Sequence, residues 1–141
     1  MDHKESPQDQ VNSIIELFSS GQTQEALVDI ETLINDFPNE PLLFNISGVF
    51  YKQIGQLDEA IKQFENAIAI NPDYPEAHNN LGVTLQNLGL MDEAVISYEK
   101  AIASNPDYAE AHNNLGNLFK ELKQLDAAVK SYEKVIAINP D

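Results

Sequence analysis

The sequence predicts an all-α fold of four helix–turn–helix repeats, and three observations lead to this prediction. Every proline and every glycine of the chain falls on a 34-residue spacing. These residues form four series: Pro7/Pro41/Pro75, Pro38/Pro72/Pro106/Pro140, Gly21/Gly55/Gly89 and Gly48/Gly82/Gly116. Segments Pro75–Asp107 and Ala109–Asp141 are identical at 20 of 33 positions. Because glycine and proline are the residues most sensitive to backbone geometry, their shared spacing indicates one repeated backbone.

The third repeat shows why each unit should form two helices. Its first half places apolar or half-apolar residues at helical spacing: Ala77, His78, Leu81, Leu85 and Leu88. Its second half does the same: Met91, Ala94, Val95, Tyr98, Ala101 and Ile102. Gly89 suits the left-handed position that ends the first helix, and Pro106 ends the second because it removes a backbone donor.

The same pattern in all four repeats predicts eight helices, at residues 8–20, 23–36, 41–54, 57–70, 75–88, 91–104, 109–122 and 125–138. A disordered tail is expected at residues 1–6. A single array follows over 7–141, with repeats at about 7–40, 41–74, 75–108 and 109–141. A helix pair of this length cannot bury its apolar face alone, so the repeats should stack into a solenoid. Small residues in two columns, Gly48/Gly82/Gly116 and Ala60/Ala94/Ala128, favour a close approach of the two helices within a repeat.

Charge and composition exclude several functional classes. The 141 residues carry a formal net charge of −15, and all eight basic residues are lysines. Nucleic acid would be repelled, because binding it requires cationic side chains that neutralise phosphates. No apolar run approaches the ~18–20 residues of a membrane span, and the first residues, MDHKESPQDQ, lack the apolar core of a signal peptide. We therefore expect no membrane insertion and a cytoplasmic location. The absence of cysteine excludes disulfides and cysteine-based metal sites.

The repeat resembles the tetratricopeptide repeat family. The resemblance covers about residues 7–141 and rests on the period and on five columns: Leu81-Gly82, Ala94, Tyr98, Ala101 and Pro106. The chain departs from the family pattern at Ile14, at Lys123 in a glycine column, and in having no tryptophan. The segment Ala111–Asn117 (AHNNLGN) is similar to repeats of O-GlcNAc transferases and of bacterial relatives. The family implies a right-handed superhelix whose first helices line a concave groove for partner peptides.

The groove columns of the family supply nine candidate partner-binding positions: Asn45, Val49, Lys52, Asn79, Val83, Gln86, Asn113, Asn117 and Lys120. An asparagine amide has both donor and acceptor groups. One hypothesis is therefore that an asparagine ladder pairs with the backbone of an extended peptide. The alternative is that these asparagines bond to neighbouring repeats and hold the array together.

Sharper sites are disfavoured by the residues themselves. The family's carboxylate clamp uses Lys, Asn and Arg, but this chain has no arginine, and Glu76 and Glu110 stand at the groove side. His78 and His112 lie one repeat apart on first helices ~8–10 Å apart, whereas the ligands of one zinc ion must converge within ~2 Å of it. Partly buried histidines within the helix stack are therefore favoured over a metal site. The acidic residues recur by repetition rather than by convergence. We expect no catalytic residues, no metal and no cofactor.

The last helix has no polar cap after it. Side chains that would pack on a fifth repeat should be exposed, and these are candidate self-association residues: Val129, Tyr132, Ile136 and Ile138. Either the chain is part of a longer protein or its end forms a homo-oligomer. The sequence favours a non-enzymatic scaffold that binds a protein or peptide partner. The alternative is a recognition domain of a longer enzyme, such as a glycosyl-, sulfo- or methyltransferase.

Overall fold

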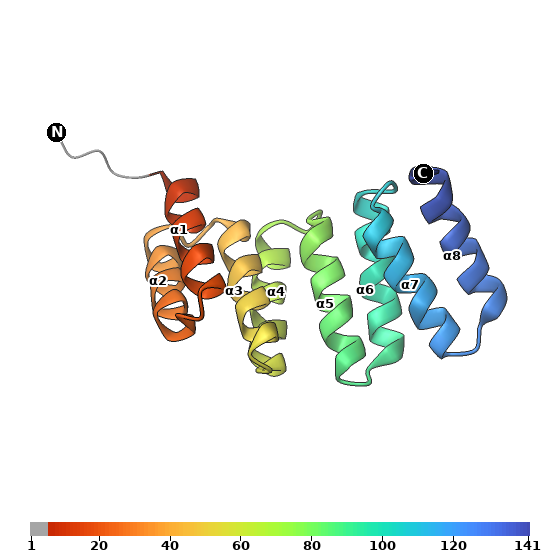
Figure 1. Cartoon of the computed structure of the whole chain (residues 1–141), viewed down its shortest axis with the longest axis horizontal. Helices are drawn as coiled ribbons and strands as arrows, with labels where there is room; N and C mark the ends of the chain where they lie inside the picture. The colour runs from red at the N-terminus through yellow and green to blue at the C-terminus, as the bar shows by residue number, and fades with distance from the viewer. Residues whose placement is uncertain (1–5) are drawn as a thin grey trace. The chain divides into compact units, whose positions relative to one another are not determined.

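The computed structural model describes residues 6–141, which form eight α-helices and no strand (Figure 1). The helices are α1 (Pro7–Ser19), α2 (Thr23–Asp36), α3 (Pro41–Gln53), α4 (Leu57–Ile70), α5 (Pro75–Asn87), α6 (Met91–Ser104), α7 (Ala109–Glu121) and α8 (Leu125–Ile138). Each boundary lies within one residue of its predicted place. The predicted tail falls outside the described residues except for Ser6, whose Oγ accepts a hydrogen bond from the Asp9 amide and caps α1.

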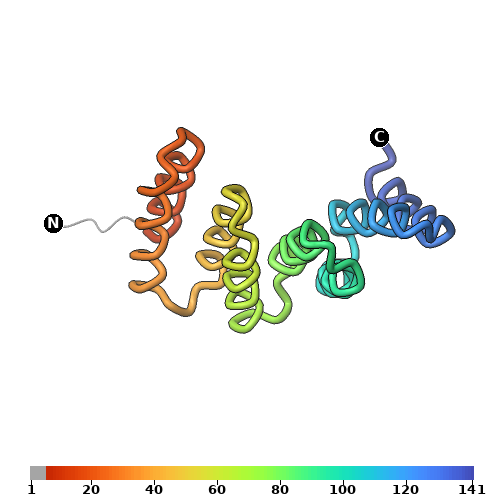
Figure 2. The backbone as a smooth tube through the Cα atoms, turned by 90° about the horizontal axis from the view of Figure 1, so that it is seen from below, coloured from red at the N-terminus to blue at the C-terminus, as the bar shows by residue number. Residues whose placement is uncertain are grey.

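The helices group into two compact units, divided after Ile70. In the first unit, α1, α2 and α3 supply one apolar core, and the Phe18 and Phe50 rings stack with centroids 4.2 Å apart. Helix α4 packs on α3. In the second unit, α5 packs on α6, α6 on α7, and α7 on α8. The chain doubles back at the turn inside every helix pair (Figure 2). None of the helices in residues 6–141 has the length and apolar character needed to cross a membrane.

Glycine lets an aromatic ring lie directly on the first helix of three repeats. A β-carbon added to Gly82 would stand 2.7 Å from the ring of Tyr98, and one added to Gly116 would stand 2.8 Å from that of Tyr132. Gly48 has the same relation to Phe64. Such distances are far below ordinary carbon–carbon contacts. The predicted close approach within repeats is therefore confirmed, and the ring of the second helix is what occupies the space.

A left-handed residue separates the two helices of each repeat. Gly21, Gly55 and Gly89 have φ between +82° and +89°. Lys123 takes the same place in the fourth repeat with φ +61°. This backbone region is costly for a residue with a β-carbon. The fourth repeat therefore keeps the turn in spite of its side chain.

Candidate partner-binding surface

In the second unit, five of the predicted groove residues lie at the surface of α5 and α7. Asn113, Asn117 and Lys120 on α7 are exposed. Val83 and Gln86 on α5 are half-buried. In the first unit, Val49 and Lys52 on α3 are also half-buried. These seven side chains are therefore accessible to a partner to different degrees.

Two of the predicted ladder asparagines are buried instead. Asn79 is 1% exposed, and its Oδ1 accepts a hydrogen bond from the Asn114 side chain at 3.1 Å. The bond joins α5 to α7, as the structural alternative for these asparagines requires. Asn45 is 9% exposed. Asn113 is thus the ladder member that lies open to solvent.

Tyrosines of the second helices hold two amides of the surface. The Tyr98 hydroxyl donates to Gln86 Oε1 at 2.8 Å, and the Tyr132 hydroxyl donates to the Asn117 side-chain oxygen. Each bond uses the amide oxygen and leaves the NH2 group of that amide for another acceptor. Sequence reasoning found Gln86 and Asn117 but missed their tyrosine partners. The spacing of Gly82 and Tyr98 could have indicated one such ring above the first helix.

Burial and nearby carboxylates favour the protonated form of three tyrosines, Tyr51, Tyr98 and Tyr108. Burial, and secondarily Glu121, raises the pKa of Tyr98. Burial and the hydrogen bond to Glu31, which accepts from the Tyr51 hydroxyl at 2.9 Å, raise the pKa of Tyr51 to about 12. Burial and Glu110 raise the pKa of Tyr108 to about 12. These three hydroxyls therefore stay protonated and can donate hydrogen bonds at neutral pH.

The two histidines considered as metal ligands, His78 and His112, form hydrogen bonds to the backbone instead. His78 is buried with Nε2 2.8 Å from the carbonyl of Pro72, and His112 is buried with Nε2 2.8 Å from the carbonyl of Pro106. Because a carbonyl only accepts, Nε2 must carry the proton and donate it. Each histidine thus ties its helix to the turn before it. Among the described residues, no three His, Asp or Glu side chains gather closely enough to hold a metal ion.

The outer face of α8 differs from the same face of α6. In α6, Tyr98 is buried and Val95 and Ile102 are partly covered, because α7 packs on this helix. In α8, the equivalent Val129 is 52% exposed and Ile136 is 63% exposed. The other two predicted self-association residues, Tyr132 and Ile138, are partly buried. An apolar face that a following helix covers on α6 is therefore open on α8.

Comparison with known proteins identifies the repeat. A family model described as TPR repeat matches residues 48–89 and 91–123, which is more than half of the chain. A second, described as tetratricopeptide repeat, matches residues 109–141. The chain belongs to the tetratricopeptide repeat family. Tetratricopeptide repeats are typically found in non-catalytic scaffolds that bind other proteins. Membership of the family therefore supports a protein-binding role for this chain.

Solved structures confirm the predicted all-α repeat fold. A crystal structure of MamA matches with 26% sequence identity and a TM-score of 0.80. The match covers 89% of this chain and 73% of the MamA chain. A second MamA crystal structure is 22% identical, with a TM-score of 0.81 and coverages of 96% and 74%. A structure of MamA from residue 41 to the end, from Desulfovibrio magneticus RS-1, is 20% identical, with a TM-score of 0.82 and coverages of 96% and 76%. No curated protein sequence matches the chain.

Proposed function

We propose that the protein is a scaffold that binds an extended segment of a partner protein on the first helices of its repeats. In the second unit, the binding residues are Val83, Gln86, Asn113, Asn117 and Lys120. In the first unit, Val49 and Lys52 belong to the corresponding surface. Asn45 and Asn79 are left out of the proposal because their side chains are buried.

The observation that carries this proposal is the pair of tyrosine–amide hydrogen bonds. Tyr98 holds Gln86, and Tyr132 holds Asn117, so the two amides are oriented before any partner arrives. A donor that is already oriented loses less side-chain entropy on binding. The NH2 groups of both amides, together with the Lys120 ammonium group, are suited to donate hydrogen bonds to backbone carbonyl oxygens of a partner.

The chemistry of this surface favours some segments over others. Contacts to the backbone give affinity with little dependence on sequence, whereas Val83 offers one apolar contact. The protein has a net charge of −15 and no arginine. A neutral or basic segment is therefore easier to accommodate than an acidic one.

The test starts from peptides selected for binding to the full chain from a displayed library of twelve-residue sequences. Their affinities are then measured by calorimetry with the double variant Gln86→Ala/Asn117→Ala. Loss of two hydrogen bonds, each worth about 0.5–1.5 kcal/mol, should weaken binding about tenfold. Circular dichroism should show unchanged helix content.

The matched control is Gln24→Ala/Asn66→Ala, which removes two exposed amides from second helices. It should leave the affinity unchanged. A second variant, Tyr98→Phe/Tyr132→Phe, keeps the binding amides but frees their orientation, so it should cost less than the double alanine variant. Equal affinities for all three variants would reject the proposed surface.

We also propose that the outer face of α8 contacts a second copy of the chain. The support is the exposure of Val129 and Ile136 on a helix whose counterpart, α6, is covered by α7. Ile136→Lys should shift any oligomer toward monomer in light scattering, because a charge on this face would lose its hydration in the contact. Ala137→Lys, beside it on α8, is the control. An unchanged mass for Ile136→Lys would rule out this contact.

A further inference from the structure

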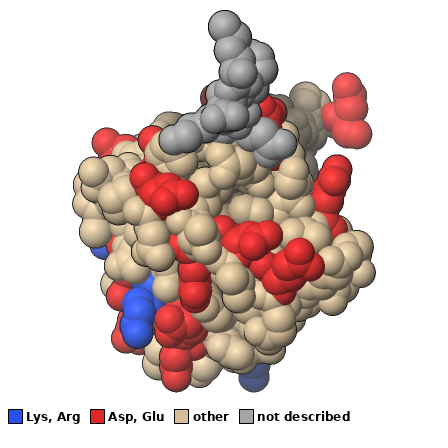
Figure 3. Space-filling view, turned by 90° about the vertical axis from the view of Figure 1, so that its left-hand side faces the viewer, with Lys and Arg blue, Asp and Glu red and all other residues tan. Residues whose placement is uncertain are grey.

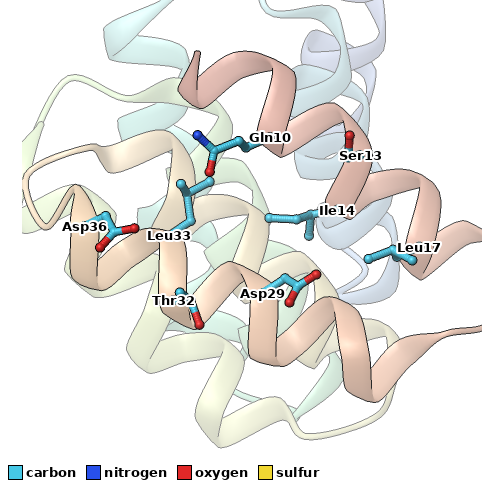
Figure 4. A pocket seen from close by; sticks show the side chains of 8 residues that line it. All are labelled: Gln10, Ser13, Ile14, Leu17, Asp29, Thr32, Leu33 and Asp36. Carbon is cyan, nitrogen blue, oxygen red and sulfur yellow. The ribbon is translucent and has the colours of Figure 1, made fainter. Parts of the chain in front are cut away.

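A groove with a buried floor and an acidic rim lies between α1 and α2 (Figure 4). It encloses about 260 Å³. Its lining comes from four residues of each helix: Gln10, Ser13, Ile14 and Leu17 of α1, and Asp29, Thr32, Leu33 and Asp36 of α2. Ile14 and Leu33 are buried, so they form the floor.

The same groove recurs in two other repeats. The α3–α4 groove, of about 230 Å³, is lined by Phe44, Ser47, Gln63 and Asn66, each 34 residues after Gln10, Ser13, Asp29 and Thr32. The α7–α8 groove, of about 390 Å³, uses the residues 102 positions later: His112, Leu115, Ser131 and Lys134. The groove is therefore a property of the repeat rather than of one sequence.

In these two repeats a third helix completes the groove. The α3–α4 groove is walled by α2 through Glu31, Ile34 and Asn35. The α7–α8 groove is walled by α6 through the equivalent Glu99, Ile102 and Ala103. The first groove is lined by α1 and α2 alone, so it has no such wall among the described residues. In both of the walled repeats the wall helix presents an isoleucine to the groove, Ile34 from α2 and Ile102 from α6.

The charge of the first groove differs from that of the last. The wall residue Glu99 lines the α7–α8 groove together with Lys130 and Lys134. The residues at the lysine positions in the first repeat are Val28 and Thr32, and Asp29 replaces Ser131. A wall helix carrying glutamate would therefore place its carboxylate near Asp29, with no lysine at either equivalent position.

The whole first repeat lacks positive charge. No lysine, arginine or histidine occurs between Glu5 and Tyr51, whereas Ser6–Glu40 contains seven acidic residues. Within residues 6–141, no cation forms an ion pair with Asp29 or Asp36. The end of the molecule that presents this repeat shows acidic side chains across its face and few lysines (Figure 3). A positively charged occupant fits this surface by complementarity.

We infer that the α1–α2 groove binds a basic amphipathic helix of a partner protein. The helix presents Ile, Val or Leu toward Ile14 and Leu33, and it carries Lys or Arg about one turn earlier, where Glu31 and Glu99 stand in the internal walls. The exposed Val28, at 60%, adds an apolar contact at the edge. This surface is distinct from the first-helix surface of the proposed function.

A second copy of the chain fits less well in this groove. Ile136 of α8 is the equivalent of Ile34 and Ile102, so its shape suits the site. However, Glu133 stands at the position of Glu31 and Glu99 and would face Asp29 and Asp36. Replacing this one charge should therefore turn a poor occupant into a good one.

Two stapled helical peptides with the sequence of residues 125–138 test the inference. One is unaltered, and the other carries Glu133→Lys alone; both are stapled between positions 127 and 131, away from Ile136. Their affinity for the full chain is measured by fluorescence anisotropy at about 50 mM salt, where Coulomb interactions reach beyond ~10 Å. The lysine peptide should bind at least tenfold more tightly. Its NMR shift changes should centre on Ser13, Val28 and Thr32.

A charge-matched pair of protein variants separates the groove from general attraction to an acidic protein. Asp29→Asn/Asp36→Asn should weaken binding of the lysine peptide about fivefold or more. Glu65→Gln/Glu93→Gln removes the same charge from exposed sites on α4 and α6 and should change it less than twofold. Four results would overturn the inference: no binding at millimolar peptide, equal binding of both peptides, equal effects of both variant pairs, or shift changes centred elsewhere.

Discussion

The first and fourth repeats fill the space between their two helices with different pairs of side chains. In the fourth, Gly116 leaves space on α7 and the Tyr132 ring of α8 takes it. In the first, Ile14 and Ile30 occupy the two equivalent positions, so the volume is divided between the helices. Both repeats keep the same helix boundaries to the residue. The backbone thus requires a total volume between the helices rather than glycine or an aromatic ring by itself.

The two repeats also expose different faces. The groove of the first repeat has an acidic rim, whereas the outer face of α8 is apolar and the α7–α8 groove carries lysines. In each compact unit, the equivalent groove of the second repeat is walled by a preceding helix. The first and fourth repeats therefore differ in the charge that lines their grooves and in which apolar face is left open.

The largest expected effect comes from breaking the glycine–ring contact. Gly82→Ala should lower the free energy of unfolding by about 1–3 kcal/mol, because the added methyl group overlaps the Tyr98 ring. The double variant Gly82→Ala/Tyr98→Ile imitates the first repeat and should lose less than the sum of the single changes. Urea denaturation measures all three values. Additive losses would show that the two positions do not share one space.

A smaller effect should follow from giving the fourth repeat the turn of the others. Lys123→Gly should raise the free energy of unfolding by about 1 kcal/mol, because glycine adopts the left-handed conformation without a β-carbon penalty. Lys123→Ala keeps the β-carbon and removes the charge. If Lys123→Ala does not stabilise the protein, the gain from Lys123→Gly comes from the backbone conformation. If both variants give equal gains, the gain comes from removal of the charge.

The smallest effect is expected at alkaline pH. The pKa values of Tyr51 and Tyr108 are raised to about 12, so folding favours their neutral forms. This contribution is complete below the unfolded value near 10 and is lost as pH rises toward 12. The melting temperature should therefore fall between pH 10 and 12. Tyr51→Phe should flatten this fall, and an unchanged slope would contradict the assignment.

The helices were predictable because their signals are local. Prolines at first positions, glycines at left-handed turns and apolar residues at helical spacing each act within a few residues. The prediction therefore reached the boundaries of all eight described helices. It also identified Lys123 as a departure, although the sequence did not indicate that the chain would keep φ positive there.

The side-chain partners of the candidate surface were not predictable in the same way. The bond between Asn114 and Asn79 joins residues 35 positions apart, and Tyr132 reaches Asn117 across a helix pair. Such pairings depend on rotamers and on the angle between packed helices, which periodicity does not specify. The recurring grooves were missed for the same reason, although their lining residues share the 34-residue spacing.

The histidine bonds to the turns have a consequence for how the second unit folds. The Asp107 amide donates to the Asn105 side chain, and His112 bonds to the carbonyl of Pro106, six residues away. The same bonds recur one repeat earlier, where the Asp73 amide donates to the Asn71 side chain and His78 bonds to the carbonyl of Pro72. Contacts this close along the chain close with little loss of entropy and form rapidly. We therefore expect the junctions before α5 and α7 to form early, setting the direction in which each following helix grows.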